Sequence, residues 1–282
     1  MAKENTAKFN ELQQQTVDQI IDQLENGDLA LWQKEWLSCG MPKNPISGTS
    51  YSGGNILILL MERAKHAYTT SNWVTFNGLK SKKESVLKGQ KSTLISRPRS
   101  MMTIKDKNNE DQKIPLSYGC IPVYNIDQTT MEIEVEDQEI LGDDNAAADK
   151  IIDAMTKDLE SLVYNGDRAF YRKSSDLVNL PERFKTASGK YATAFHEFGH
   201  ATMHESRLGR EANGSFGTPE YAREELVAEM TSAFLCADMK VEGELQHANY
   251  IKGWIKLLKD DNKALFSAAS KATAAYNYIK AA

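Results

Sequence analysis

Three of the five histidines in this chain fall within nine residues, at His196, His200 and His204. Residues four positions apart in a helix lie one turn apart on the same face, so His196 and His200 can present imidazole nitrogens to one ion. Glu197 follows the first histidine, where a carboxylate can take a proton from a metal-bound water and deliver it to a leaving group. The pattern His-Glu-x-x-His therefore predicts a zinc-dependent hydrolytic site with Glu197 as its general base.

Two histidines leave such a site incomplete, because a catalytic zinc normally has three protein ligands and a water. The downstream candidates are Glu224, Glu225 and Glu229, which share one apolar stretch. We favour Glu225, because with Glu229 it forms a Glu-x-x-x-Glu pair one turn apart. That pair resembles the gluzincin arrangement, in which the second acid holds a ligand histidine in its tautomer. The expected ion is Zn²⁺ or another divalent transition metal such as Mn²⁺.

His204 has a different expected role. On a straight helix it lies about 12 Å from His196, too far for both side chains to reach one ion. We expect His204 beside the site, either supporting a ligand or facing a substrate. The alternative for the whole motif is a helix that carries these residues by chance; the helical context, the acid-rich segment downstream and a preceding strand favour a metal.

The elements that position these residues follow from the spacing of apolar side chains. Helices at 188–205 and 219–238 carry the proposed ligands, and a short strand at 175–181 precedes them. Residues 72–76 fit either a strand or the start of a helix. Further helices are predicted at 9–24, 54–65, 146–162, 243–259 and 262–279, and further strands at 92–96, 101–104 and 114–124. The expected fold class is α+β.

Charge divides the chain into two parts. Residues 80–107 hold nine Lys and Arg against two acids, whereas residues 127–144 hold eight acids and no Lys or Arg. A chain of 282 residues is roughly twice a typical domain. We therefore expect an N-terminal domain at 1–142 and a mostly helical, zincin-like domain at 146–282.

Composition excludes several classes of protein. A net charge of −5 does not favour general polyanion binding, so any nucleic-acid contact must come from a local patch. The longest apolar run, Ile56–Met61, is far too short to cross a bilayer. Cys39, Cys120 and Cys236 are scattered and odd in number, which indicates free thiols. We expect a cytoplasmic protein with no membrane partner.

The motifs taken together resemble the ArdC antirestriction family of plasmids and phages. The resemblance covers most of the chain and depends on the order and spacing of these motifs: Trp32-Gln33-Lys34-Glu35-Trp36, Pro42-x-Asn44, Tyr51-x-Gly53-x-Asn55, Trp73-Val74-Thr75-Phe76, Lys88-Gly89-Gln90-Lys91, Asp176–Pro181, His196–His200 with His204, Ser206-Arg207-Leu208 and Glu224–Glu229. Two positions depart from the family pattern: Glu35, where proline is frequent, and Gln90, where glutamate is common.

The resemblance implies an N-terminal domain that binds single-stranded DNA and a C-terminal metallopeptidase-like domain, which together shield incoming DNA from restriction. Single-strand binding requires cations along the backbone and aromatic faces for the bases. The candidate stacking rings are Trp32, Trp36, Tyr51, Trp73 and Phe76. Of these we favour a core position for Trp73 and Phe76 over base stacking, and we expect Tyr51 as an exposed ring. The candidate DNA contacts are Lys82, Lys83, Lys88, Lys91, Arg97, Arg99, Tyr51 and Trp32.

Two other readings remain open. The chain could be a cytoplasmic metalloprotease whose N-terminal half selects a protein substrate and has no DNA role. It could also be a protective or protein-mimicking factor whose metal site only holds the fold.

Overall fold

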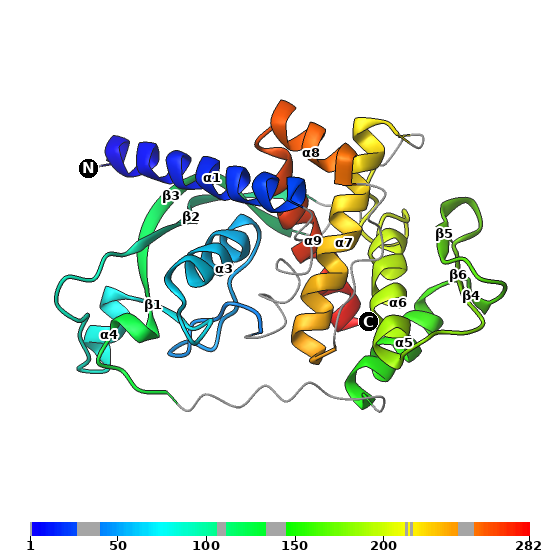
Figure 1. The fold of residues 1–282 in the computed structure, drawn as a ribbon, viewed down its shortest axis with the longest axis horizontal. Coiled ribbons are helices and arrows are strands. Elements are labelled where there is room, and N and C mark those ends of the chain that lie inside the picture. The colour runs from blue at the N-terminus through cyan, green and yellow to red at the C-terminus, as the bar shows by residue number, and fades with distance from the viewer. Residues whose placement is uncertain are drawn as a thin grey trace.

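The computed structural model describes residues 2–26, 40–105, 111–133, 145–211, 214, 217–241 and 251–282. Within them the chain has an α+β fold, as the sequence predicts (Figure 1). None of the described helices is both long and apolar enough to span a membrane. The expected residues Trp32, Trp36 and Cys39, the acidic residues 134–144 and the predicted helical residues 243–250 lie outside the described residues.

The N-terminal half combines helices with one antiparallel sheet. A long hairpin curves around α3 with α1 lying across it (Figure 1). The sheet has the strand order β1-β3-β2. Its elements are α1 (Ala2–Glu25), α3 (Gly54–His66), β1 (Trp73–Thr75), α4 (Phe76–Ser81), β2 (Thr93–Lys105), β3 (Asp111–Asn125) and a short 3-10 turn, η1 (Ile126–Gln128).

Two predictions for this half need refinement. The strands predicted at 92–96 and 101–104 are one strand, β2, whose pairing with β3 shifts register between Pro98 and Met101. Proline lacks a ladder N–H, so the strand bends at a bulge there without ending. The sequence predicts either a strand or the start of a helix at residues 72–76, and the segment contains both: β1 ends at Thr75 and α4 begins at Phe76.

Among the described residues, the C-terminal half packs five helices beside a small sheet with the order β4-β6-β5. The predicted helix at 146–162 ends at Asp158, and the chain continues into a strand that pairs in parallel with β6. The elements are α5 (Ala146–Asp158), β4 (Ser161–Tyr164), β5 (Phe170–Arg172), η2 (Lys173–Ser175), β6 (Leu177–Leu180), α6 (Ala187–Ala201), α7 (Pro219–Met239), α8 (Ile251–Asp260) and α9 (Ala264–Ala281).

Helix α7 lies at the centre of the molecule and touches both halves. One buried cluster joins Val17 of α1 and Leu57 of α3 to Met230 and Phe234 of α7. A second cluster packs the other side of the C-terminal half around Phe195 and Phe198 of α6. Glu224, Glu225 and Glu229 are buried on the same helix α7. The helix that carries three acids of the candidate site is therefore also part of the core shared by both halves.

Candidate metal centre

Helix α6 carries the His-Glu-x-x-His motif through the interior of the C-terminal half. The Thr186 side chain caps its first turn by accepting a hydrogen bond from the Gly189 N–H at 3.0 Å. His196 and Glu197 are 2% and 4% exposed. Because charged and polar side chains are costly to bury without partners, their position implies a polar environment inside the core.

That environment comes from α7, which crosses α6 at Gly199. A Cβ placed on Gly199 would lie 3.0 Å from Ala228 Cα and 3.3 Å from Thr231 Cβ. Glycine therefore permits a backbone approach that any other residue would obstruct. Ala228 lies three residues after Glu225, so the close crossing brings that carboxylate over the two histidine rings.

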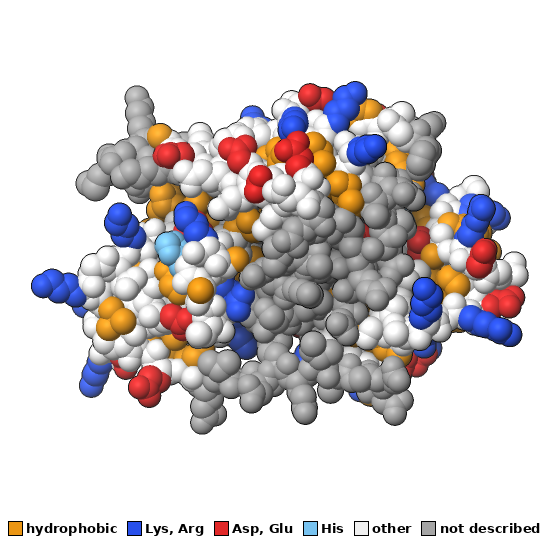
Figure 2. All heavy atoms as spheres, in the orientation of Figure 1, with side chains coloured by type: hydrophobic (Ala, Val, Ile, Leu, Met, Phe, Trp, Pro, Cys, Tyr) orange, Lys and Arg blue, Asp and Glu red, His pale blue; other side chains and the backbone are white. Residues whose placement is uncertain are grey.

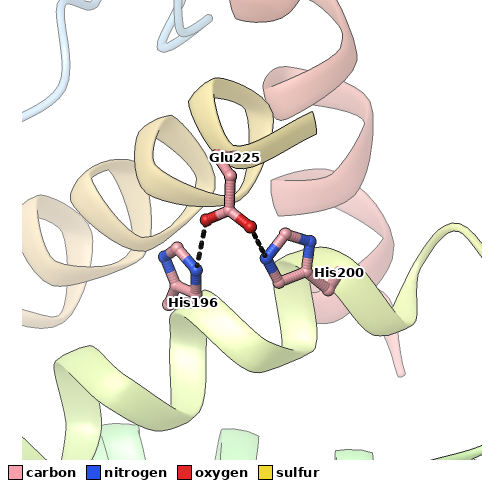
Figure 3. A group of neighbouring side chains, drawn as sticks. All are labelled: His196, His200 and Glu225. Carbon is pink, nitrogen blue, oxygen red and sulfur yellow. Dashed lines mark ion pairs between the residues drawn. The ribbon is translucent and has the colours of Figure 1, made fainter. Parts of the chain in front are cut away.

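Glu225 lies between the two rings, as Figure 3 shows. Its two carboxylate oxygens are each 3.5 Å from an Nε2 atom, one on His196 and one on His200. The three side chains can each offer one ligand atom such that all lie within 4.8 Å of one another. Ligand atoms about 2.1 Å from a tetrahedral ion are roughly 3.4 Å apart, which the two 3.5 Å spacings between Glu225 and the histidines match.

The chemistry of these atoms also fits a cation. The unprotonated nitrogen of a neutral imidazole and a carboxylate oxygen are both acceptors, so they face one another favourably only around a proton or a metal ion. Burial opposes protonation of His196, but Glu225 and Glu229 outweigh it and raise its pKa to about 9. Burial likewise opposes protonation of His200, and Glu224 and Glu225 raise its pKa to about 10. The pocket is therefore strongly cation-attracting.

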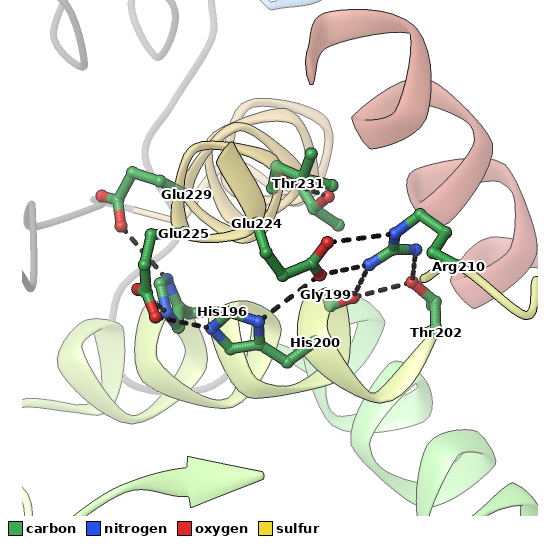
Figure 4. Close-up of polar contacts among 10 residues, drawn as sticks. His196, Gly199, His200, Thr202, Arg210, Glu224, Glu225, Glu229 and Thr231 are labelled. Carbon is green, nitrogen blue, oxygen red and sulfur yellow. Dashed lines mark hydrogen bonds and ion pairs between the residues drawn. The ribbon is translucent and has the colours of Figure 1, made fainter. Parts of the chain in front are cut away.

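Two further carboxylates lie behind the histidine rings (Figure 4). Glu229 Oε2 is 3.1 Å from His196 Nδ1, a distance at which Nδ1–H donates and leaves Nε2 free to bind a metal. Glu224 Oε1 is 3.5 Å from His200 Nδ1. His200 Nδ1 is buried without a hydrogen bond, so a small movement of Glu224 would complete the same arrangement on the second histidine.

Arg210 fixes Glu224 in that position, a contact that the sequence motifs did not predict. Its guanidinium lies 2.6 Å from Glu224 Oε1 and donates to the Gly199 and Thr202 oxygens at the end of α6 (Figure 4). Both members of the ion pair are 9% exposed. Arg210 therefore neutralises Glu224 and also satisfies the Gly199 carbonyl and the Thr202 hydroxyl at the C-terminal end of α6.

Arg207 makes a second connection at the end of α6. Its guanidinium pairs with Asp176 and donates to the Ala201 carbonyl at 2.8 Å. Asp176 also accepts a hydrogen bond from Tyr171, a residue of β5, at 2.8 Å. The motifs Asp176–Pro181 and Ser206-Arg207-Leu208, far apart in sequence, therefore meet in one ion pair that ties the small sheet to α6.

A cavity of about 250 Å³ opens onto the candidate site. It exposes the general base predicted from the sequence, Glu197, beside the two histidines. One edge of the cavity is the strand β5, one of the two outer strands of its sheet. The lining residues are Ala169, Phe170, Tyr171, Lys173, His196, Glu197, His200, Met203, Gly214, Tyr221, Glu224 and Glu225.

His204 is not part of this cavity. The predicted helix at 188–205 ends at Ala201, and His204 lies in the turn that follows. Its Nδ1 atom is 2.7 Å from Ser206 Oγ. The distance of about 12 Å between His196 and His204 assumes a straight helix through both residues, and that assumption is wrong because the helix ends before His204. The role expected for His204 beside the site stays a prediction.

The basic segment of the N-terminal half is largely exposed, but its expected aromatic residues are not where the sequence placed them. Tyr51 is half-buried and donates its hydroxyl hydrogen to the Trp73 carbonyl at 2.9 Å, so the expectation of an exposed ring is wrong. Burial raises the pKa of Tyr51 to about 12. Trp73 is fully buried as expected, whereas Phe76 is 54% exposed and lies outside the core.

The expected DNA-contacting cations form an exposed group. Trp32 lies outside the described residues, and the Arg99 side chain is likewise not described. No ion pair between described residues involves the remaining ones. Those that are described and exposed are Lys82, Lys83, Lys88, Lys91 and Arg97.

Comparisons with known proteins match both halves. Residues 10–135 match the model for the N-terminal domain of anti-restriction factor ArdC, and residues 146–271 match a zincin-like metallopeptidase model. Crystal structures of the antirestriction ArdC protein from plasmid R388 superpose with a TM-score of 0.75 in both metal-free and Mn(II)-bound forms. The metal-free structure is 30% identical and the match covers 95% of this chain and 96% of that one; the Mn(II)-bound structure is 28% identical, with coverages of 95% and 97%.

Curated relatives add a second context. An uncharacterized protein, y4eC of Sinorhizobium fredii, is 30% identical across 93% of this chain and 89% of its own length. Two proteins of Escherichia coli called DNA primase TraC are 30% and 32% identical, but this chain spans only 27% and 19% of their lengths. With the donor atoms described above, the zincin-like match and the Mn(II)-bound relative indicate a divalent metal ion in this fold.

Proposed function

This chain belongs to the ArdC antirestriction family, and we propose that it binds single-stranded DNA, holds a divalent metal at a peptidase-like site and protects incoming plasmid or phage DNA from restriction in the cytoplasm. The observation that supports the metal half best is the pair of 3.5 Å contacts between Glu225 and the two histidines. The DNA half is supported by the exposed cations and the family relation.

His196, His200 and Glu225 would hold the metal, either Zn²⁺ or Mn²⁺. Such an ion lowers the pKa of a bound water towards neutrality and polarises a carbonyl group. Glu229 keeps the His196 Nδ1 proton in place, so that Nε2 faces the site. Arg210 holds the carboxylate of Glu224 behind His200.

Glu197 is positioned for proton transfer. It is 4% exposed and opens onto the cavity beside His196 and His200. Its carboxylate would accept a proton from the attacking water and pass it to the leaving amine of a peptide. A peptide segment could lie along β5, an outer strand of its sheet that borders the cavity, where unpaired backbone groups can bond an extended chain.

The decisive experiment separates metal binding from hydrolysis. We expect purified protein to contain about one transition-metal ion per chain by elemental analysis, and His196→Ala to lose it. Glu197→Ala should keep the metal and lose hydrolysis, with Glu205→Ala, an exposed acid just beyond α6, as the control. If Glu197→Ala retains both metal and full protection in a restriction assay, hydrolysis is not the function and the metal only supports the fold. If His196→Ala changes no metal content, the site itself is wrong.

The DNA half is tested separately, with a metalloprotease without a DNA role as the competing function. Replacing Lys88, Lys91, Arg97 and Arg99 by Ala should strongly weaken binding of labelled single-stranded oligonucleotides. The matched control removes four exposed lysines from the C-terminal half: Lys150, Lys157, Lys252 and Lys256. If both quadruple variants lose the same affinity for the oligonucleotide, binding depends only on the net charge of the protein and not on this surface. No binding by the unmodified chain at low salt would leave the metalloprotease as the better reading.

A further inference from the structure

Phe76 is the most exposed of the large hydrophobic side chains among the described residues, with 54% of its surface open to water. It stands at the first position of α4, whose preceding residue, Thr75, caps the helix by accepting from the Gly78 N–H at 3.1 Å. Val74 and Leu79 on either side are fully buried. The helix cap and the two buried neighbours therefore hold the backbone at Phe76 in place, while its ring faces solvent.

Four lysines follow this ring within twelve residues of the chain. Lys80 lies one helical turn after Phe76 on α4, and so on the same side of the helix. Lys82 and Lys83 follow the helix end, and Lys88 lies in the next loop. All four lysines are exposed, and no ion pair between described residues neutralises any of them. Figure 2 shows Lys and Arg side chains projecting around the end of the molecule where Figure 1 places α4.

Glu84, the one acidic residue between Phe76 and Lys91, forms no ion pair with these lysines among the described residues. Glu84 is half-buried, and its carboxylate accepts a hydrogen bond from the Thr130 hydroxyl. Ser85 and Thr130 also exchange two hydrogen bonds of 3.0 and 2.9 Å, and Leu87 N–H donates to the Gln128 carbonyl at 2.9 Å. The loop that bears Lys88 is therefore anchored to the segment after β3.

The loop and α4 also share one apolar support. Val86 packs against the cluster formed by Val74, Leu79 and Ile126. The ring and the lysines therefore stand on one rigid unit, which lowers the conformational cost of binding a ligand across it.

We propose that Phe76 is a base-stacking ring for single-stranded DNA, with the phosphates contacted by Lys80, Lys82, Lys83 and Lys88. The inference depends on the DNA binding proposed above and assigns it a surface. An exposed ring among lysines combines the two features that single strands require, a flat face for a base and cations for the backbone. A duplex hides the faces of its bases, so the same ring would contribute little to duplex binding. Trp73 is buried in the N-terminal half, and the half-buried Tyr51 ring packs against the same cluster, so Phe76 offers a far more open face than either.

The test uses the full chain and fluorescence anisotropy with a labelled single-stranded oligonucleotide at several salt concentrations. Phe76→Ala should weaken the affinity for the oligonucleotide roughly 5- to 150-fold, because the variant loses the stacking of one base. The dependence of affinity on salt should not change, because the ring neutralises no phosphate. Phe76→Trp should restore binding. In contrast, alanine at Lys82 and Lys83 should flatten the logarithmic salt dependence by about 0.7 for each phosphate that is no longer neutralised.

Tyr164 supplies a matched control, since it is an aromatic residue with 45% exposure in the other half of the molecule. Both positions are on the surface, and thermal unfolding will verify that each alanine variant is folded. If the unmodified chain does not bind the oligonucleotide, the proposed DNA function fails and this inference with it. If the unmodified chain binds and Phe76→Ala behaves like Tyr164→Ala, the function stands and the stacking role is refuted. Equal losses on single-stranded and duplex DNA also refute it. So does a Phe76→Ala variant that binds DNA normally but no longer protects it, because the ring would then contact a protein.

Discussion

Gly199→Ala is the sharpest test of how the fold assembles the metal centre. The added Cβ would lie 3.0 Å from Ala228 Cα, whereas ordinary contacts begin near 3.4 Å. Helices α6 and α7 must therefore separate by about 0.4 Å at their crossing, because the obstructing atom is backbone. His196 and His200 are on α6 and Glu225 is on α7, so the same movement separates the ligands.

The expected magnitude has two opposing parts. Alanine favours a helix over glycine by about 1 kcal/mol, whereas overpacking a close crossing costs about 1–3 kcal/mol. Gly253→Ala provides the matched control, because a Cβ there meets nothing nearer than 3.8 Å. The control should be neutral or more stable than the unmodified chain, and Gly199→Ala should be about 1–3 kcal/mol less stable than the control. Metal sites tolerate errors of about 0.2 Å in ligand distance, so metal affinity should fall about tenfold or more.

Chemical denaturation in the presence of a chelator measures the stability difference, and calorimetric titration with Zn²⁺ or Mn²⁺ measures the affinity. The reasoning is refuted if Gly199→Ala matches Gly253→Ala in both quantities. A variant that loses stability but binds metal normally would show that the crossing is tight without setting the ligand distances.

Three further predictions concern the surroundings of the site. Arg210→Ala should cost about 3 kcal/mol in urea denaturation, because it leaves the Glu224 carboxylate buried without its partner, and a double variant with Glu224→Gln should recover part of the loss. Burial raises the pKa of Asp176, but hydrogen bonds from Arg207 and a tyrosine outweigh it and leave the pKa below its usual 3.8. The stabilisation by ionised Asp176 is therefore present above about pH 4 and lost as the pH falls further, so Asp176→Asn should destabilise the chain at pH 7 and much less at pH 3. Burial raises the pKa of Cys236 to about 12, so peptide mapping should find this thiol unmodified by iodoacetamide in the native protein; rapid native labelling would contradict its burial.

The parts of the site that the sequence predicted are those governed by local geometry. The i, i+4 spacing of His196 and His200 places them together on any helix, and the same rule pairs Glu225 with Glu229. The choice of Glu225 over its neighbours also followed from a spacing pattern. The structure places its oxygens 3.5 Å from both histidines, although its role as a ligand stays a prediction.

What sequence reasoning missed depends on contacts between distant segments. Arg210 meets Glu224 only because the chain turns back after α6, and no periodicity marks that pair. The strands β4 and β5 are four and three residues long, too short for an alternating pattern to stand out. Phe76 looked like a core residue because it follows the apolar strand β1, but the chain enters a helix at that point and the ring turns outward.

The core around α7 bears on whether the two halves act separately. Leu57 and Leu60 of α3 pack into the same cluster as Val227 and Met230 of α7. A hydrogen bond of 2.9 Å also joins the Gly53 N–H to Thr273 in α9. Separating the halves would expose this shared apolar surface to water, so we expect them to unfold in a single transition despite two sequence modules.

Metal binding should then protect α3 as well as α7. At a free metal concentration of 100 times the dissociation constant, binding stabilises the folded state by about 2.7 kcal/mol. If the halves share one transition, hydrogen exchange followed by mass spectrometry should show that gain in the slowest amides of both helices. Protection confined to α6 and α7 would mean that the N-terminal half opens independently. In that case the shared core would not couple DNA binding to the metal centre, and α7 would serve only the site on its own side.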